Sequence, residues 1–211
     1  MEDAKKHPDY EMLDERLSFL QVTPYNKRCF WRWLAMASLD NEDGGWMSDY
    51  DVFPLELDAE KANELTVDGT FRSYALHIPC LIHASRAEWD RVIHLMIDVL
   101  PEERGTFVTD MLTLQNVDFE LGRSKMEWTL DVASNFLYSL DENNERYLDC
   151  GKGERKLAVH LSHFGCSEAW KDGFYPLTDG IENAEGAVES RADAAAYMMN
   201  DYKDGCIVSV E

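Results

Sequence analysis

The stretch that decides the fold runs from Thr70 to Leu100 and reads TFRSYALHIPCLIHASRAEWDRVIHLMIDVL. Its first half is apolar and aromatic and predicts a central strand over residues 70–83, with a bulge or an edge at Pro79, which lacks a backbone donor. Its second half predicts a helix over residues 85–100. Ser85 is a suitable N-cap, a glutamate follows three residues later, and apolar residues then recur at helical spacing. The two elements are therefore expected to share one core.

The length and composition indicate a globular chain. The 211 residues are 45% hydrophobic and 11% aromatic, which suffices for one sizeable core. The apolar runs are far shorter than the roughly 20 residues that cross a bilayer, and the N-terminal residues do not form a signal-peptide pattern. We expect a soluble, cytoplasmic protein that does not bind membranes. The cysteines are odd in number and widely spread, which predicts reduced thiols at Cys29, Cys80, Cys150, Cys166 and Cys206.

The remaining segments predict an α+β fold in a single domain over residues 1–211. Residues 1–40 predict an N-terminal helical hairpin, because Asp9 and Thr23 are suitable caps and a proline follows Thr23. Residues 41–211 predict a mostly antiparallel sheet with helices. Within this part we expect a short strand over 52–57, a brief helix over 58–65, a three-stranded meander over 126–164, a loop-rich segment over 165–189, a helix from Ser190 and a terminal strand over 206–210.

The charge is the unusual property of this chain. It has 41 acidic and 20 basic residues, a formal net charge of −21, and each third of the sequence is net acidic. Such a surface opposes direct binding to nucleic-acid phosphates and attracts basic proteins. The alternative interpretation is that the acidity serves solubility or adaptation to salt.

The segment 40–51, DNEDGGWMSDYD, is acidic, contains a glycine pair and predicts a loop. It does not fit the calcium loop of an EF-hand, because position 5 is Gly44 and position 12 is Asp51 rather than glutamate. Aromatic residues flanked by acids suit a protein-binding surface. The partner-binding residues we predict are Asp40, Glu42, Asp43, Trp46, Asp49 and Asp51.

No pattern in the sequence names a reaction, so we predict no catalytic residue, no metal ligand and no cofactor. The best zinc candidates are His160, His163 and Cys166, with Cys150 on the neighbouring strand of the predicted meander. On a strand, however, residues three apart point to opposite faces, and the chain has no Cys-x-x-Cys pair. A nucleophilic dyad of Cys80 with His77 or His83 has the same weakness, and buried structural roles are the alternative.

These observations favour a non-enzymatic, acidic inhibitor that binds a basic protein. The partner would be an enzyme that handles nucleic acid, bound through charge mimicry of DNA or RNA, or a nuclease toxin bound by an immunity protein. Phage or plasmid counter-defence is the expected setting. The alternatives are a metal-assisted hydrolase using His160, His163 and the acidic loops, and a structural or virion component. The sequence does not define the oligomeric state.

Two short segments resemble plasmid antirestriction proteins. They are Glu15-Arg16-Leu17-Ser18-Phe19-Leu20 and Gly44-Gly45-Trp46. The sequence after Trp46 does not continue the likeness, so it does not assign the chain to a family. It implies only the same kind of function that the charge favours.

Overall fold

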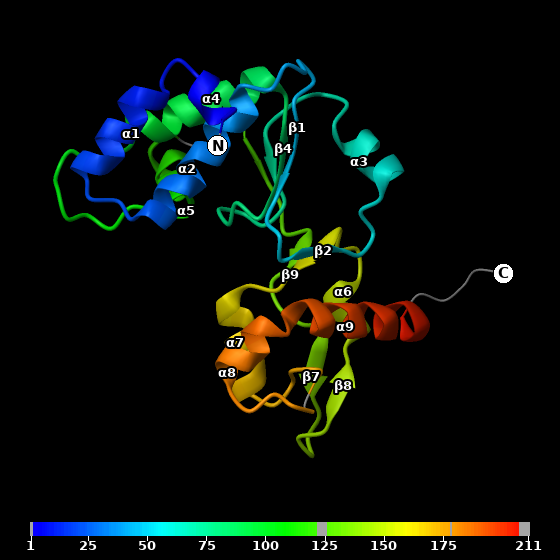
Figure 1. The fold of residues 1–211 in the computed structure, drawn as a ribbon. Helices are drawn as coiled ribbons and strands as arrows, with labels where there is room; N and C mark the ends of the chain where they lie inside the picture. Colours follow the sequence, from blue (N-terminus) through cyan, green and yellow to red (C-terminus); the bar gives the residue numbers. More distant parts are fainter. Residues whose placement is uncertain (1, 122–125, 178, 207–211) are drawn as a thin grey trace. The chain divides into compact units, whose positions relative to one another are not determined.

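The computed structural model describes residues 2–121, 126–177 and 179–206, which form the α+β fold that the sequence predicts (Figure 1). The strand pairing is mostly antiparallel. The chain divides into two compact units. Unit 1 comprises Met1–Ser48 and Asn63–Thr129, and unit 2 comprises Asp49–Ala62 and Leu130–Glu211. Each unit has a hydrophobic cluster of its own.

Unit 1 begins with the predicted helical hairpin. Thr23 caps the second helix, since its Oγ1 accepts a hydrogen bond of 3.2 Å from the backbone N–H of Asn26, and Pro24 occupies the first helical position. The elements of unit 1 are η1 (Ala4–Lys6), α1 (Tyr10–Phe19), α2 (Pro24–Ala37), β1 (Gly45–Ser48), β3 (Arg72–Ser73), β4 (Leu81–Ala84), α4 (Arg86–Asp98), α5 (Asp110–Leu121) and β5 (Glu127–Trp128). Helix α3 (Ala59–Leu65) contains the junction from unit 2 back to unit 1.

Helix α4 begins where the sequence predicts. The backbone N–H of Glu88 donates to the Ser85 side chain at 3.4 Å, and Trp89, Val92, Ile93 and Met96 are buried on one face. Figure 1 shows α2 and α4 side by side next to strands β1 and β4. Trp33 of α2 packs edge-on against Trp89, with 5.4 Å between the ring centroids, so aromatic contacts join these helices in one core.

The central strand predicted over residues 70–83 is two strands in the structure. Strands β3 and β4 pair antiparallel, Arg72 with His83 and Ser73 with Ile82. The chain reverses between them because Leu76 has a positive φ of 52° and Pro79 cannot donate to a ladder. The four-stranded sheet has the order β1-β4-β3-β5. The turn therefore replaces the predicted bulge, and β4 leads directly into α4.

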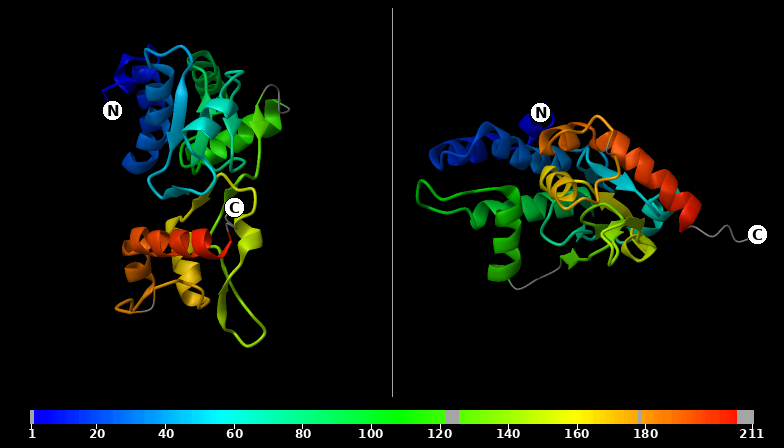
Figure 2. Two further views of the ribbon diagram at one scale, coloured as in Figure 1. Left: turned by 90° about the vertical axis from the view of Figure 1, so that its right-hand side faces the viewer. Right: turned by 90° about the horizontal axis from the view of Figure 1, so that it is seen from below.

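Unit 2 contains two smaller sheets, one of three strands in the order β2-β9-β6 and the other the hairpin β7-β8. Strand β2 is an edge strand that includes Pro54, as expected. The elements are β2 (Val52–Pro54), β6 (Val132–Ala133), β7 (Tyr138–Leu140), β8 (Arg146–Leu148), α6 (Cys150–Gly153), β9 (Ala158–His160), α7 (His163–Lys171), α8 (Ala184–Glu189) and α9 (Arg191–Gly205). Both views of Figure 2 show α7 and α8 near the N-terminal end of the long α9.

Of the meander predicted over residues 126–164, only the antiparallel hairpin β7–β8 is present, and the rest of the prediction is wrong. The alternating segment passes from unit 1 to unit 2 after Thr129, so β5 pairs parallel with β3, whereas β6 pairs parallel with β9. Alternation reports which side chains are buried but not which strand lies alongside. The loop predicted over 165–189 is also wrong in part, because α7 and α8 occupy much of it.

The helix predicted from Ser190 is present as α9, and Cys206 follows it. The rest of the predicted terminal strand, 207–210, lies outside the described residues. Cys206 forms a disulfide with Cys150, with 5.4 Å between the Cα atoms, which corrects the prediction that all the thiols are reduced. Cys29, Cys80 and Cys166 do not take part in this disulfide. Among the described residues, no helix has the length and apolar character needed to cross a bilayer.

Candidate functional site

Unit 1 contains a cleft of about 590 Å³, which we call the acidic cleft. Its lining includes three acidic residues and, among the described residues, no lysine or arginine. The lining includes Glu42, Asp43, Trp46, Asp68, His83 and Ser85. The cleft therefore offers carboxylates and an aromatic ring to one occupant.

The first wall of the acidic cleft is formed by Glu42, Asp43 and Gly44, which directly precede β1. Its backbone is hydrogen-bonded to the start of α4. The backbone N–H of Arg86 donates to the carbonyl of Glu42 at 3.3 Å. Gly44 has a φ of +76°, and a Cβ there would lie 2.0 Å from the carbonyl oxygen of Ala84. Only glycine permits this close approach of the wall to β4. The backbone of Glu42 is thus attached to the N-terminal, positive end of α4.

The second wall contains Asp68 and Gly69, and its backbone is hydrogen-bonded to the start of the same helix, α4. The backbone N–H of Ser85 donates to the carbonyl of Gly69 at 2.9 Å. The Asp68 side chain accepts from the backbone N–H of Thr70 at 3.0 Å, and this hydrogen bond lowers the pKa of Asp68. Both walls are therefore fixed by backbone hydrogen bonds before any partner arrives.

Trp46 and His83 line the cleft between these walls. They are opposite each other on β1 and β4, with 5.3 Å between ring centroids, and Trp46 also stacks on Tyr74 at 5.2 Å. Burial and, to a lesser degree, the positive charge of Arg72 lower the pKa of His83 to about 4. At neutral pH the imidazole is uncharged, so it does not repel a cation.

Two arginines lie near the acids without lining the cleft. Arg86 approaches Glu42 at 3.4 Å, and Arg72 approaches Asp68 at the same distance. Arg72 has a closer partner in Glu127, 2.5 Å from its Nε. The two carboxylates are exposed and these ion pairs are long, so each pair is weak.

The predicted partner-binding residues fall into two groups. Glu42, Asp43 and Trp46 line the acidic cleft, and Asp40 lies exposed just before it. Asp49 and Asp51 belong to unit 2. The segment 40–51 is also not all loop, because Gly45–Ser48 is strand β1. Trp46 is half-buried, since its neighbour across the sheet is His83.

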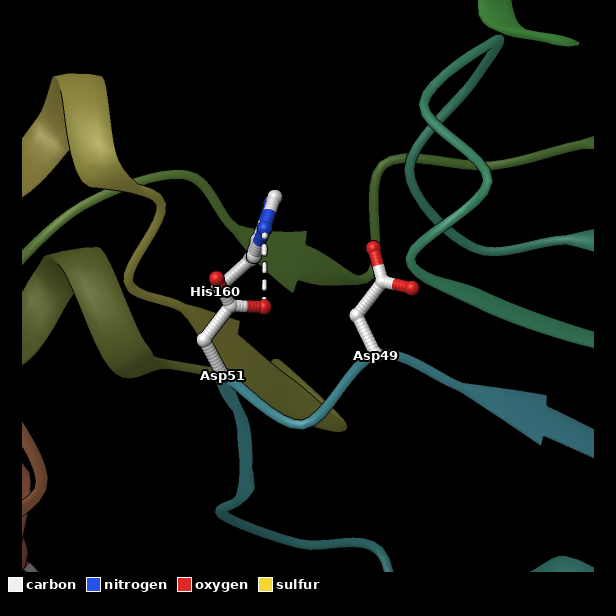
Figure 3. A group of neighbouring side chains, drawn as sticks. All are labelled: Asp49, Asp51 and His160. Carbon is white, nitrogen blue, oxygen red and sulfur yellow. Dashed lines mark ion pairs between the residues drawn. The ribbon is translucent and has the colours of Figure 1, made fainter. Parts of the chain in front are cut away.

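A second cluster lies in unit 2, where Asp49, Asp51 and His160 each offer one ligand atom and these atoms lie within 4.8 Å of one another (Figure 3). Figure 3 shows the Asp51 carboxylate beside the His160 imidazole, with Asp49 on the other arm of the same turn. Asp51 Oδ1 is 3.4 Å from His160 Nε2. The backbone places the pair, because Leu161 N–H donates to the Asp51 carbonyl at 2.9 Å and Val52 is opposite His160 in the sheet.

The surroundings of this cluster are polar. Tyr50 OH lies 3.1 Å from His163 Nε2, and the guanidinium of Arg191 lies 4.7 Å from the centre of the Tyr50 ring. Burial opposes the ionisation of Asp51, but His160 and Arg191 outweigh it, and the pKa of Asp51 lies below its ordinary value. Asp51 is therefore a buried carboxylate that stays charged at neutral pH.

The zinc candidates named from the sequence do not come together. His163 begins α7 rather than continuing a strand, Cys150 is in the disulfide, and Cys166 is buried with a pKa raised by that burial to about 11. His160 instead meets the acidic turn. His160 meets the acidic turn because β2 lies beside β9. No spacing of residues in the sequence predicts that strand pairing.

The residues of the candidate nucleophilic dyad, Cys80 with His77 or His83, also have separate environments. His77 pairs with Asp118 at 3.0 Å, whereas His83 and Cys80 are buried elsewhere in unit 1. Sequence reasoning missed Asp68 and Arg191 as site residues, and it considered His83 only for a dyad with Cys80 and not for the acidic cleft. The Asp68-Gly69 turn and the Gly44-Gly45 pair were the signals for the cleft walls, since each lets the backbone approach Ser85 or Ala84.

We compared the chain with known proteins, and no family model, no curated protein and no solved structure matches it.

Proposed function

We propose that this chain is a non-enzymatic, acidic inhibitor that binds a basic protein that handles nucleic acid. It would be an anti-defence protein that mimics nucleic acid or an immunity protein for a nuclease toxin. The acidic cleft would take a lysine or arginine of the partner, and the distributed charge would guide the approach. The single observation that carries the proposal is a preformed cleft with acidic and aromatic lining on a chain of net charge −21.

The chemistry of the acidic cleft supports a cationic occupant. Glu42, Asp43 and Asp68 supply carboxylates, and the face of Trp46 supplies a cation–π contact worth about 0.5–1 kcal/mol at an exposed site. Neutral His83 adds no opposing charge. Because both walls are tied to the start of α4, little conformational entropy is lost when the partner binds.

Cytoplasmic location is part of the same proposal, because enzymes that handle nucleic acid act there. The three cysteines outside the disulfide fit a reducing compartment. The Cys150–Cys206 disulfide is the feature that such a compartment would reduce. A metal-assisted hydrolase stays a second candidate, because Asp49, Asp51 and His160 converge, but it requires a bound metal ion.

Charge reversal in the acidic cleft tests the proposal. Wild-type chain and the Glu42→Lys/Asp43→Lys variant are immobilised and exposed to lysate of the native host or its prey, and bound proteins are eluted with stepped NaCl. We expect a basic nucleic-acid-handling protein on the wild type, released by moderate salt and displaced by added double-stranded DNA or RNA. The variant should bind it at least about tenfold more weakly, because two attractive charges become repulsive.

A matched control separates the cleft from net charge. Glu102→Lys/Glu103→Lys makes the same change at two exposed, adjacent acids outside the cleft. This control should bind nearly as well as the wild type. Equal losses in both variants would mean that bulk charge rather than the cleft recognises the partner, and retention that is insensitive to salt would remove the electrostatic argument altogether.

A further inference from the structure

We propose that Asp49, Asp51 and His160 form a binding site for a divalent transition-metal ion in unit 2, with Zn²⁺ as the preferred ion. Two carboxylates and one imidazole are the donor set that binds zinc while leaving a position for water or another ligand. The site is independent of the acidic cleft, and the proposed inhibitor function does not need it.

The spacing of the donor atoms fits a common ion. Metal–ligand bonds of about 2.0–2.2 Å place two ligands of a tetrahedral ion roughly 3.3–3.6 Å apart. The 3.4 Å between Asp51 Oδ1 and His160 Nε2 lies in this range. The Asp49 carboxylate lies on the other arm of the turn, and the three donor atoms are within 4.8 Å of one another (Figure 3). A small rotation of the Asp49 side chain completes the set.

The state of Asp51 is the independent observation that points to a ligand. Asp51 is only 6% exposed, and its buried Oδ1 atom faces His160 Nε2 at 3.4 Å, an ion-pair distance, without a well-formed hydrogen bond to any described residue. A buried carboxylate oxygen without a hydrogen bond is costly, and native proteins satisfy such atoms with a partner, water or an ion. A cation between Oδ1 and Nε2 would satisfy both atoms at the observed separation.

The backbone and the neighbouring side chains hold the cluster in place. Asp51 directly precedes β2, its carbonyl accepts from the backbone N–H of Leu161, and His160 belongs to β9, which pairs with β2. Tyr50, between the two aspartates, lies against the guanidinium of Arg191. Ligands on supported elements lose little freedom when the ion binds. Arg191 contributes one positive charge nearby, and two carboxylates still leave the site attractive to a divalent cation.

The donor chemistry selects among ions. An imidazole nitrogen is a poor ligand for Ca²⁺ and Mg²⁺, which require six or more oxygens, protein and water together. By the usual order of stability, Zn²⁺ should bind more tightly than Mn²⁺. Bound Zn²⁺ would keep an open position, since the cluster supplies three protein ligands among the described residues.

Calorimetric titration of the chelator-treated, full-length chain with Zn²⁺, Mn²⁺ and Mg²⁺ tests the site. We expect one equivalent of Zn²⁺ at micromolar or lower Kd, weaker Mn²⁺ and no Mg²⁺ at the same concentration. Asp51→Asn and His160→Gln should each weaken Zn²⁺ at least about a hundredfold. Asp49→Asn removes the remaining ligand, at a half-buried position, and leaves the Asp51–His160 pair intact.

His163→Gln is the matched control, because His163 contacts Tyr50 beside the cluster but is not one of its members. It should keep the wild-type Zn²⁺ affinity, and Co²⁺ as a probe should give the same visible absorption spectrum in this control and in the wild type. Absence of stoichiometric Zn²⁺ binding at 100 µM would overturn the proposal. So would Zn²⁺ binding that survives Asp49→Asn and His160→Gln, or that is lost in His163→Gln. None of these outcomes bears on the Glu42→Lys/Asp43→Lys experiment.

Discussion

At the residue scale, the protonation state of His83 affects both the stability of unit 1 and the charge of the acidic cleft. It is 2% exposed, it lines the acidic cleft, and its Nδ1 has no hydrogen-bond partner among the described residues. Protonation would place an unpaired charge in a buried position and add a positive charge to a cleft proposed to hold a cation. We therefore expect the stability of unit 1, and the proposed binding of a cation in the cleft, to decrease when His83 is protonated.

The first prediction concerns pH. Because the pKa of His83 falls from 6.5 to about 4 on folding, its contribution is fully present above pH 6.5 and is lost as pH falls through 4. We expect the free energy of unfolding to drop by about 3 kcal/mol between pH 7.5 and pH 4 from this group alone. Chemical denaturation of wild type and His83→Phe at both pH values measures it.

Comparing the pH-dependent change in unfolding free energy between wild type and His83→Phe separates the effect of His83 from that of the other titratable groups. Burial lowers the pKa of His94, but hydrogen bonding and charge from Asp90 and Asp9 outweigh it, so the pKa of His94 is raised and its contribution has the opposite sign. That contribution is the same in both proteins and cancels. An equal loss of stability in wild type and His83→Phe would contradict the assignment to His83.

At the element scale, the N-terminus of α4 organises unit 1. Ser85 caps the helix, its backbone holds Gly69, and the next N–H holds Glu42. Helix, sheet and both walls of the acidic cleft thus share a few neighbouring backbone groups. The sequence revealed the cap and the apolar face, whereas the attachment of the walls depends on the folded chain.

The second prediction concerns α9. The Cys150–Cys206 disulfide closes a sequence separation of 56 residues and ties the end of α9 to α6. Loss of such a link is expected to cost about 2–4 kcal/mol in the free energy of unfolding, chiefly by freeing the unfolded chain. Denaturation of the wild type with and without reductant, and of the Cys150→Ser/Cys206→Ser variant, measures this loss of unfolding free energy.

The double-serine variant is also the control for the reductant. It should show the stability of the reduced wild type and no response to reducing agent, because Cys29, Cys80 and Cys166 do not take part in the disulfide. Alkylation of the unreduced, unfolded wild type should label those three cysteines only. Labelling of every cysteine would show that the bond is absent under those conditions.

At the scale of the whole molecule, charge dominates. A net charge of −21 on 211 residues causes self-repulsion in the folded state, and the same field would attract the proposed basic partner. Salt should therefore act in opposite directions on the free chain and on its complex.

The third prediction states this opposition. Raising NaCl from 0.05 to 0.5 M should raise the Tm of the free chain by about 2–4 °C, which corresponds to roughly 1 kcal/mol at this chain length. Over the same range the affinity for the basic partner should fall steeply. Calorimetric scans and binding titrations at matched salt concentrations measure both. A Tm that does not change with salt would indicate that the acidic charges are too far apart to repel.

The sequence by itself determined the α+β class, the helical hairpin, the Ser85 cap with its buried face, and the acidic character of the surface. These features depend on local spacing and composition, which a linear chain displays directly. Only the tertiary structure decided that residues 70–83 fold back as β3 and β4, that the acidic segment is shared between two units, and that Cys150 meets Cys206. It also decided that His160 meets Asp51. The physical reason is that strand pairing and side-chain convergence join residues far apart in sequence, and no local periodicity encodes which partners meet.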